Sequence, residues 1–369
     1  MGRDLGERGV AVTSLTRERA GRYTRAARRW AGMLRTGTPE TGVRVFYGHD
    51  RVPGPGEPVA GGTAKFQRLA TRFPNSPKDF SLLYLGSTWL PRDLRGLLWD
   101  ARRRRIPLVV NQNGVGYPGW AGSEAEAFNR PLRRTLEQAV HVLYQSEFCK
   151  RAADEWVREP AGSWEVLHNA VDTRHFSPAE RPPAGGPVLL LGGDQYQAYR
   201  LELGLETLAA VRRTHPDAQL IVTGRLATPI EPIVDRLGLA GHVHALGRYS
   251  QSDAPDVYRR AQVLLHTKVN DPCPSLVIEA MATGLPVVYP LSGGVPELVG
   301  EAAGIGVPHD DGFERDRPPP AAELADAVAR VLEKLPVFAA AARQRAVERF
   351  DLEPWLERHA EIFARFAPR

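Results

Sequence analysis

The chain has 369 residues, 43% of them hydrophobic, and a formal net charge of +5. This length exceeds the size at which one core usually keeps growing, so two domains are expected. The two cysteines, Cys149 and Cys273, are too few and too far apart for a disulfide framework or a cysteine zinc cluster. No apolar run approaches the length of roughly 20 residues that spans a bilayer, and we find no secretion signal. We therefore expect a cytoplasmic protein, which could contact the inner face of the membrane peripherally.

Positive charge is concentrated in residues 1–40, which we interpret as a basic N-terminal arm. Residues 1–35 hold nine arginines against three acidic residues, a net +6, so from a total of +5 the remainder is near −1. Residues 17–35 fit an amphipathic helix that could contact anionic lipid peripherally. The same helix could instead pack on the next domain with its arginines outward, or be partly disordered. Nucleic-acid binding is not expected, because no aromatic-rich motif accompanies the charge.

Residues 41–180 alternate short apolar runs with amphipathic stretches, which is typical of parallel strands joined by crossover helices. This unit is expected to be the N-terminal domain. A Pro/Gly cluster at 181–187 then predicts an interdomain linker. The predicted strands are 43–47, 81–85, 108–111, 140–144 and 164–167, and the predicted helices include 63–73, 94–104 and 131–139.

A second cycle of strands and helices occupies residues 187–345. Two doubly wound α/β domains of this kind bind ligands in a crevice at the carboxyl ends of their strands. Residues 346–369 are expected to form a helix that crosses back to the first domain, whereas 310–320 is a loop in which we recognise no chemistry. The predicted strands are 188–191, 218–223, 243–245, 263–266 and 287–289, with helices including 203–214, 231–237 and 276–282.

The most informative segment is 270–297. It places two carboxylates, Asp271 and Glu279, eight positions apart, one before a helix and one inside it. The helix is followed by Gly284, a Val-rich strand and a Gly-Gly turn at 293–294. Polar groups and free backbone amides therefore gather where a parallel strand meets a helix, an arrangement suited to a sugar nucleotide.

The string Glu-Ala-Met-Ala-Thr-Gly-Leu-Pro-Val-Val that begins at Glu279, with Asp271 before it, resembles the signature of the retaining, family 4 type glycosyltransferases. Residues 168–178 are similar to that family's interdomain junction, Gly61-Gly62 to its N-terminal glycine loop, and 350–355 to its last helix. The resemblance covers about residues 41–369. It implies the GT-B fold, in which two Rossmann-like domains face each other across a crevice, with residues 41–180 on the acceptor side and residues 187–345 binding the nucleotide sugar.

The resemblance implies that Glu279 accepts hydrogen bonds from the ribose hydroxyls and that Asp271 holds hydroxyls of the donor sugar. The start of the helix would favour a diphosphate through the amides of Cys273, Ser275 and Leu276. Each carboxylate also has a simpler explanation. Glu279 could be a first-turn carboxylate favoured by the helix dipole, and Asp271 could be a helix cap.

Two positions depart from the family pattern. Relatives clamp the diphosphate with an Arg just after the first C-domain strand and a Lys several residues later, but this chain has Gly192-Gly193-Asp194 and then Tyr199 near those places. Some cation must stabilise the leaving group, so we expect Arg200, Lys268 and Arg225, in that order, to replace the clamp unless they are solvated surface charges. Asn113 stands where many relatives carry His, and it can hydrogen-bond a hydroxyl but not act as acid or base.

The remaining candidates are glycine turns and a base-binding segment at 247–249, where Tyr249 could equally be a core residue. Gly61-Gly62 alone would only predict a turn. The predicted catalytic residues are Asp271, Asn113, Lys268 and Arg200; the predicted donor-binding residues are Glu279, Cys273, Ser275, Leu276, Gly193, Arg225, Gly247, Tyr249, Gly293 and Gly294; Gly61 and Gly62 form the acceptor or phosphate loop, and no metal or cofactor is expected.

The resemblance implies a metal-independent, retaining transferase that moves a sugar from a nucleoside diphosphate to a hydroxyl of a polysaccharide, glycolipid or glycosylated metabolite. In that reaction the departing phosphate deprotonates the acceptor. Three alternatives stay open: a sugar-nucleotide epimerase, which needs no acceptor; a glycosidase, which would need carboxyls flanking a glycosidic bond; and a non-catalytic sugar-nucleotide binder. The base, the sugar, the acceptor and the oligomeric state are not predicted by the sequence.

Overall fold

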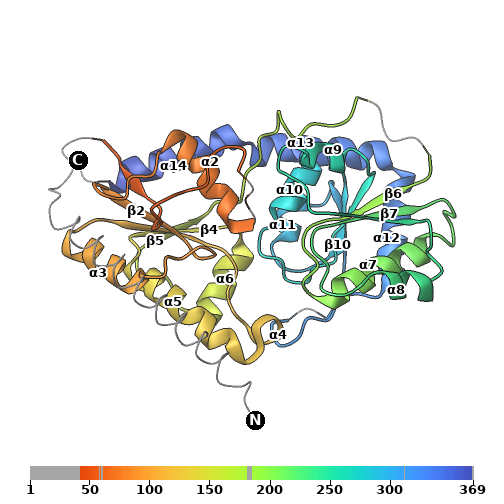
Figure 1. Ribbon diagram of the computed structural model, residues 1–369, viewed down its shortest axis with the longest axis horizontal. Coiled ribbons are helices and arrows are strands. Elements are labelled where there is room, and N and C mark those ends of the chain that lie inside the picture. Colours follow the sequence, from red (N-terminus) through yellow and green to blue (C-terminus); the bar gives the residue numbers. More distant parts are fainter. Residues whose placement is uncertain (1–41, 58, 60, 181–184, 311, 368–369) are drawn as a thin grey trace, which may run out of the picture.

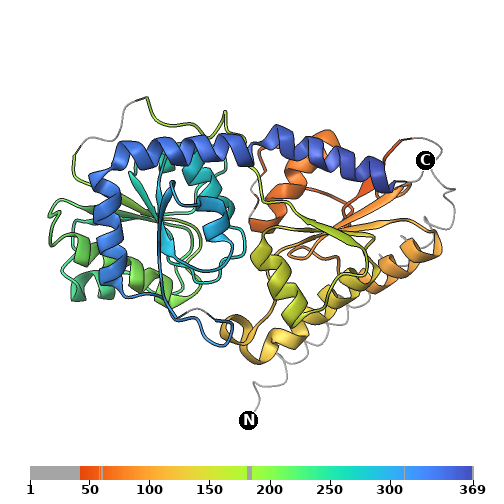
Figure 2. The ribbon, with the colours of Figure 1, turned by 180° about the vertical axis from the view of Figure 1, so that it is seen from behind.

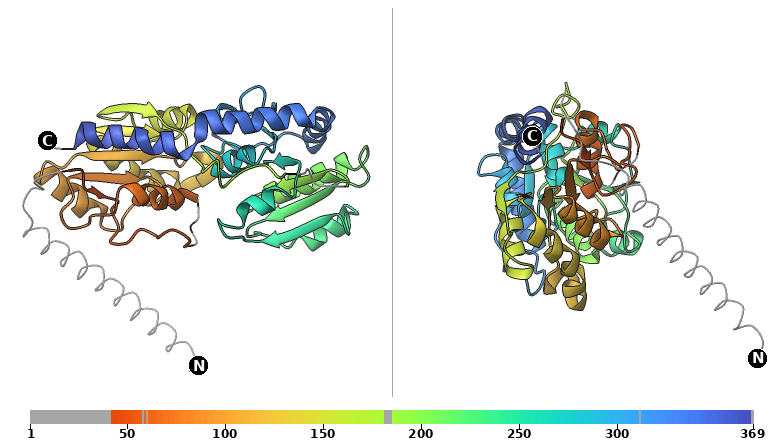
Figure 3. Two further views of the ribbon diagram at one scale, coloured as in Figure 1. Left: turned by 90° about the horizontal axis from the view of Figure 1, so that it is seen from above. Right: turned by 90° about the vertical axis from the view of Figure 1, so that its left-hand side faces the viewer.

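The computed structural model describes residues 42–57, 59, 61–180, 185–310 and 312–367. Two α/β domains lie side by side, each built on an all-parallel sheet (Figures 1 and 3). The predicted fold class, two doubly wound Rossmann-like units, is therefore confirmed. The basic arm at 1–40 and its helix at 17–35 lie outside the described residues. Among the described residues, no helix combines the length and apolar character that crossing a membrane requires.

The N-terminal domain has a five-stranded sheet in the order β1-β2-β3-β4-β5. Both faces of the sheet are covered, which explains why its central strands read as continuous apolar runs. Helices α3, α5 and α6 pack on one face, and α2 packs on the other. The elements are β1 (Val45–Phe46), α2 (Ala64–Arg72), β2 (Leu82–Gly86), α3 (Leu94–Arg103), β3 (Leu108–Gln112), α4 (Pro118–Ala121), α5 (Ala125–Gln138), β4 (His141–Tyr144), α6 (Glu147–Trp156) and β5 (Ser163–Val166), with short 3-10 turns at Gly61–Thr63 and Gly122–Glu124.

The C-terminal domain has a six-stranded sheet in the order β11-β10-β9-β6-β7-β8. The chain leaves β6 toward β7 but leaves β9 toward β10, on the opposite side, so the strand order reverses between the neighbours β6 and β9. The elements are β6 (Val188–Leu191), α7 (Ala198–Val211), β7 (Gln219–Thr223), α8 (Glu231–Arg236), β8 (Val243–Gly247), α9 (Ala254–Tyr258), β9 (Val263–Leu265), α10 (Ser275–Ala282), β10 (Val287–Pro290), α11 (Val295–Val299), β11 (Gly304–Val307) and α12 (Ala321–Glu333).

Several predicted element boundaries were wrong. Helix α5 begins six residues before the expected start at Pro131, because the helix accommodates that proline in its interior. Helix α7 begins five residues before the expected start at 203, so the segment that follows β6 is short. Strand β11 was not predicted, since two of its four residues are glycines.

The last two helices join the domains along one edge of the molecule. Figure 2 shows α13 (Leu335–Phe350) and α14 (Leu352–Phe366) end to end, α13 over the C-terminal domain and α14 over the N-terminal domain. The helix expected from residue 346 therefore begins at Leu352, after a break at Asp351. There the Val171 amide donates to the Phe350 carbonyl at 2.9 Å, and the Thr173 amide donates to the Asp351 carboxylate at 3.3 Å.

The domains also meet on the opposite side of the crevice, through a segment that we call the strap (residues 312–320, between β11 and α12). Figure 1 shows the loop that follows β11 reaching α4. Phe313 of the strap packs against Tyr117, Phe148 and Trp156 of the N-terminal domain, with ring centroids 5.1 to 6.0 Å apart. The Gly119 amide donates to the Phe313 carbonyl at 2.7 Å. The two domains are thus joined at two places, through α13 and α14 and through the strap.

Candidate active site

The candidate site lies where the strand order of the C-terminal sheet reverses. In open α/β sheets, ligands bind outside the carboxyl ends of the strands at such a reversal. Here the strands are β6, followed by Gly192 and Gly193, and β9, followed by His266 and Lys268. Arg200, at the start of α7, is tied to this edge because its carbonyl accepts from the Thr267 hydroxyl at 3.0 Å.

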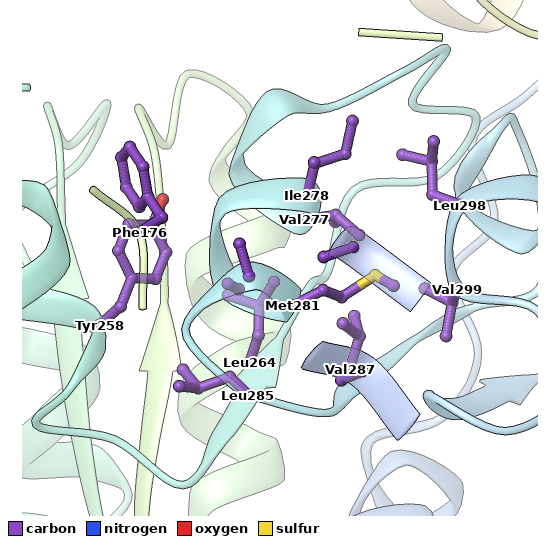
Figure 4. Close-up of a cluster of buried hydrophobic side chains, with 14 of the residues drawn as sticks. Phe176, Tyr258, Leu264, Val277, Ile278, Met281, Leu285, Val287, Leu298 and Val299 are labelled. Carbon is purple, nitrogen blue, oxygen red and sulfur yellow. The ribbon is translucent and has the colours of Figure 1, made fainter. Parts of the chain in front are cut away.

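Helix α10 is held rigidly behind this edge. Its residues Val277, Ile278 and Met281 are fully buried in the C-terminal core (Figure 4). Pro274 precedes the first helical residue, Ser275, because proline fixes the backbone angle but has no amide to donate. The helix ends at Gly284, whose φ of +81° is favourable for glycine alone among common residues. Asp271 and Glu279 are therefore attached to a well-packed element.

Asp271 is surrounded by cationic or ionisable groups. Its Oδ1 lies 3.2 Å from Lys268 Nζ, and its Oδ2 lies 3.3 Å from His266 Nε2. Burial alone would raise the pKa of Asp271, but Lys268, His266 and Arg200 together hold that pKa well below its usual range. Burial in turn lowers the pKa of His266. The carboxylate is therefore ionised throughout the physiological pH range and can accept hydrogen bonds from hydroxyl groups.

Arg200 is the buried cation of this region. Its Nη1 donates to the Asp194 carbonyl at 2.7 Å, while its buried Nε has no hydrogen-bond partner among the described residues. A buried guanidinium nitrogen without an acceptor is costly unless a ligand supplies one. The Asp194 side chain is engaged elsewhere, because it accepts from the Arg225 amide and the Tyr196 hydroxyl. Arg200 and Lys268 thus lie together beside Asp271, whereas the Arg225 side chain is exposed and only its backbone contacts Asp194.

Glu279 lies on the buried face of α10, with 8% of its surface exposed. Its Oε2 accepts from the Tyr258 hydroxyl at 2.9 Å, and its Oε1 accepts from the Gln251 amide at 3.1 Å. Arg68, which belongs to α2 of the other domain, places Nη2 3.6 Å from the same Oε1. Tyr249 joins this group through Tyr258, since the two hydroxyls are 3.4 Å apart. Glu279 therefore faces the crevice from the C-terminal side and Arg68 faces it from the N-terminal side.

Three glycine positions are dictated by close packing around α10. A side chain at Gly192 would collide with Leu276 Cδ1 at 2.6 Å. Gly293 has a φ of +68°, and a Cβ there would lie 2.6 Å from the Asp271 carbonyl oxygen. A Cβ at Gly294 would lie 2.0 Å from the Pro272 carbonyl oxygen, and the Gly294 amide donates to the Asp271 carbonyl at 2.9 Å. The Gly-Gly turn thus fixes the backbone that carries Asp271.

The N-terminal wall of the crevice contains the predicted loops and one residue that sequence reasoning missed. A side chain at Gly62 would collide with Thr88 Oγ1 at 1.9 Å, so the glycine loop lies tightly on the turn after β2. The backbone amide of Asn113 donates to the Ser87 hydroxyl at 2.9 Å. The buried Oδ1 of the Asn113 side chain has no hydrogen-bond partner among the described residues. Lys65 is buried in the first turn of α2, and its Nζ donates to Asn111 Oδ1 at 2.7 Å.

The other predicted residues are divided between the site and its surroundings. Cys273 is buried, and its carbonyl accepts from the Asn169 side-chain amide at 2.9 Å, so this position joins the two domains. Ser275 begins α10 and Leu276 packs on Gly192. Gly193, with a φ of +79°, donates its amide to Thr223 Oγ1 at 3.2 Å. Gly247 ends β8 with a φ of +68° and lies in an exposed stretch. Gly61 begins the turn that leads into α2.

Sequence reasoning missed four residues that contact the two carboxylates, and it also missed one buried lysine of α2: these are His266, Tyr258, Gln251, Arg68 and Lys65. One signal existed for the last two. The apolar stripe of α2 includes Phe66 and Leu69, and Lys65 and Arg68 lie next to it at a spacing of three. Basic residues bordering a buried stripe indicate cations that face the protein interior rather than solvent.

The same two-domain arrangement occurs in solved structures. HepE from Anabaena, in complex with UDP, superposes with a TM-score of 0.63 at 20% identity, covering 82% of this chain and 81% of that chain. Sucrose-phosphate synthase from Thermosynechococcus elongatus gives a TM-score of 0.62 at 20% identity, covering 81% and 76%. At this identity the likeness establishes the fold, and it identifies the two-domain arrangement as GT-B.

Curated relatives match about half of the chain. The D-inositol 3-phosphate glycosyltransferase of Mycobacterium sp. (strain KMS) is 26% identical over 219 residues, covering 54% of this chain and 50% of that protein. The gpi3 subunit of the Schizosaccharomyces pombe phosphatidylinositol N-acetylglucosaminyltransferase is 22% identical over 184 residues, covering 49% and 40%. The chain thus aligns with about half the length of these relatives. The family model for group 1 glycosyl transferases matches residues 173–348, which include Asp271 and Glu279, so this part of the chain has the sequence pattern of that family.

Proposed function

We propose that this protein is a glycosyltransferase that moves a sugar from a nucleoside-diphosphate donor to a hydroxyl acceptor. The observation that carries the proposal is the placement of Asp271 and Glu279 at one edge of the C-terminal sheet, beside the reversal between β6 and β9. Asp271, just before α10, and the buried Glu279 within it can hold two different sets of hydroxyls, those of the transferred sugar and those of the ribose.

Each neighbouring group has a role in this proposal. The free amides at the start of α10 and the cations Arg200 and Lys268 receive the diphosphate, whose negative charge grows as the sugar departs. Asp271, kept ionised by Lys268 and His266, accepts hydroxyls of the donor sugar. Glu279 accepts the ribose hydroxyls, which would take the place of the Gln251 amide, while Arg68 stays beside the carboxylate.

We further propose that the reaction retains the anomeric configuration and needs no metal ion. Arg200 and Lys268 supply the positive charge that a leaving diphosphate requires. Neither Asn113, an amide, nor the buried His266, whose pKa is lowered, is suited to deprotonate an acceptor. The departing phosphate oxygen is then the base, and attack takes place on the face that the leaving group occupies.

We also propose which nucleotide the donor carries and which class of molecule is the acceptor. UDP is the first nucleotide to test, because the HepE structures contain UDP and UDP-glucose. The acceptor is proposed to be a hydroxyl of a glycan, a lipid-linked glycan or a glycosylated metabolite that enters along the Gly61-Gly62 and Asn113 side of the crevice. Peripheral contact with a membrane through residues 17–35 would suit a lipid-linked acceptor.

The test is a thermal-shift screen with UDP, GDP, ADP and TDP and their common sugar conjugates, run on wild type and on Glu279→Gln. A ligand present at 100 times its Kd stabilises a protein by about 2.7 kcal/mol, so binding is measurable. We expect one nucleotide family to stabilise the wild type and to lose most of that effect in Glu279→Gln. The exposed Glu301→Gln is the matched control and should behave as wild type. Absence of stabilisation by every nucleotide would refute the proposal.

One observation favours a second candidate, a sugar-nucleotide binder without catalysis. Asp194 and Tyr199 stand near the positions where relatives carry the clamp cations, and the Asp194 side chain is already engaged by Tyr196 and Arg225. Donor hydrolysis distinguishes the two candidates. A protein that binds a sugar nucleotide yet releases no nucleoside diphosphate from it, with or without glycoside acceptors, would be the binder.

A further inference from the structure

The strap, residues 312–320, brings a carboxylate to the candidate site that the function proposed above does not use. Asp316 is half-buried, and its Oδ2 accepts from the Gln197 side-chain amide at 3.0 Å. Its Oδ1 is buried without a hydrogen-bond partner among the described residues. A buried carboxylate oxygen without a hydrogen-bond donor destabilises the folded protein unless a ligand supplies that donor. The strap thus presents an acceptor atom that is suited to a ligand.

Asp316 and Asp271 share the same neighbours. Lys268, which lies 3.2 Å from Asp271, is also within electrostatic range of Asp316. Tyr117 and Tyr199 each interact electrostatically with both carboxylates. The two acidic groups therefore flank one lysine and two tyrosines, a combination of hydrogen-bonding groups and aromatic rings that suits a polyhydroxylated ring.

Asn270, which joins the strap to the Asp271 segment, has two further features that suit a ligand site. Asn270, immediately before Asp271, has a φ of +53°, a conformation that is costly for most residues but tolerated by asparagine. The Asn270 side-chain amide donates to the Gly312 carbonyl at 2.9 Å, which ties the strap to the Asp271 segment, while its buried Oδ1 has no partner among the described residues. A second unpaired acceptor, Asn270 Oδ1, thus lies in the segment to which the strap is tied.

We propose that Asp316 is a sugar-binding residue of the donor site and that it accepts hydroxyls of the same sugar that Asp271 holds. This inference rests on the proposed function. Gln197, Lys268 and Tyr199 all belong to the C-terminal domain, at the carboxyl ends of β6 and β9, and for this reason we assign Asp316 to the donor sugar rather than to the acceptor. The strap then contributes to the choice of sugar, because its carboxylate accepts hydroxyls only at certain ring positions.

The test compares two affinities in each variant. Isothermal titration with UDP and UDP-glucose, or with another nucleotide pair that stabilises the wild type, is run on wild type, Asp316→Asn and Asp316→Ala. We expect Asp316→Ala to lose about tenfold or more in affinity for the sugar nucleotide, as for a buried hydrogen bond to a charged group, with unchanged affinity for the nucleoside diphosphate. Asp316→Asn keeps an acceptor for Gln197 and should lose less.

The matched control is Asp310→Asn, on the same β11 to α12 connection, whose carboxylate pairs with Arg317 at the surface. Its two affinities should equal those of wild type. The inference is overturned if Asp316→Ala leaves both affinities unchanged, if it weakens both ligands equally, or if the sugar adds nothing to wild-type binding. A wild type that binds no nucleotide at all overturns the proposed function instead, and the inference with it. Thermal unfolding of each variant verifies that the strap substitutions leave the fold intact.

Discussion

The two walls of the crevice differ in how their charges are balanced. On the C-terminal wall, Asp271 contacts Lys268 and His266 of its own segment, so the charges are neutralised locally. On the N-terminal wall, Lys65 contacts the neutral amide of Asn111, and Arg68 reaches across to Glu279 of the other domain. The C-terminal wall is therefore preorganised for a ligand, whereas on the N-terminal wall Lys65 has a neutral partner and the carboxylate partner of Arg68 belongs to the other domain.

The strongest test of the preorganised wall is Asp271→Asn. Removing this carboxylate leaves Lys268 without its ion-pair partner and takes away an acceptor for donor hydroxyls. We expect kcat to fall by about 100-fold or more, which is typical for the loss of one preorganised electrostatic group. Steady-state kinetics with saturating sugar nucleotide measure the effect. Asp256→Asn, which removes an exposed carboxylate paired with Arg259, is the control, and a kcat of Asp271→Asn within threefold of wild type would contradict the comparison.

Lys65 tests the N-terminal wall through pH. Burial lowers the pKa of Lys65 to about 8, from an ordinary value of 10.5. Between these values the unfolded chain holds a proton that the folded protein has released, so the free energy of unfolding of wild type rises with pH relative to Lys65→Met. At 1.36 kcal/mol per pKa unit, the rise between pH 8 and 10.5 is at most about 3 kcal/mol.

Urea unfolding of wild type and Lys65→Met at pH values from 7 to 10 measures this difference. Lys334→Met, which removes an exposed lysine, should keep a constant difference from wild type over the same range. If the difference in free energy of unfolding between wild type and Lys65→Met is also constant, Lys65 is not a desolvated amine. The two walls would then differ less in how their charges are balanced.

The smallest effect is expected for Arg68→Gln. This change removes the partly buried cation 3.6 Å from Glu279 and the contact that holds the domains together there. We expect the KM for the sugar nucleotide to rise about threefold to fivefold with little change in kcat, because the Arg68 guanidinium lies 3.6 Å from Glu279, beyond the length of a good hydrogen bond, and contacts no reacting group in the proposal. Arg72→Gln, at an exposed position on the same helix, serves as the control. A lower KM would mean that Arg68 competes with the donor for Glu279.

The sequence predicted the fold class, most central strands and the helix that carries Glu279, because these features depend on local periodicity and on glycine and proline positions. The contacts around the carboxylates depend on residues distant in the chain. Arg68 precedes Glu279 by 211 positions, and Asp316 lies in a loop without regular structure. Such encounters are set by tertiary packing, so local pattern could not reveal them. The start of α5 was missed because a proline inside a helix resembles a boundary.

The position of α14 has a consequence for how the protein is made. Trp355, Leu356, Ile362 and Phe363 of this helix belong to the same buried cluster as Val45, Tyr47 and Tyr84 of the N-terminal domain. The ribosome adds these residues after the elements of the C-terminal domain, so the domain that is synthesised first cannot complete its core until α14 has emerged. The C-terminal domain, whose sheet is continuous in sequence, can close earlier. Folding during synthesis then finishes in the reverse of chain order, in contrast to the usual N-terminal-first sequence of events.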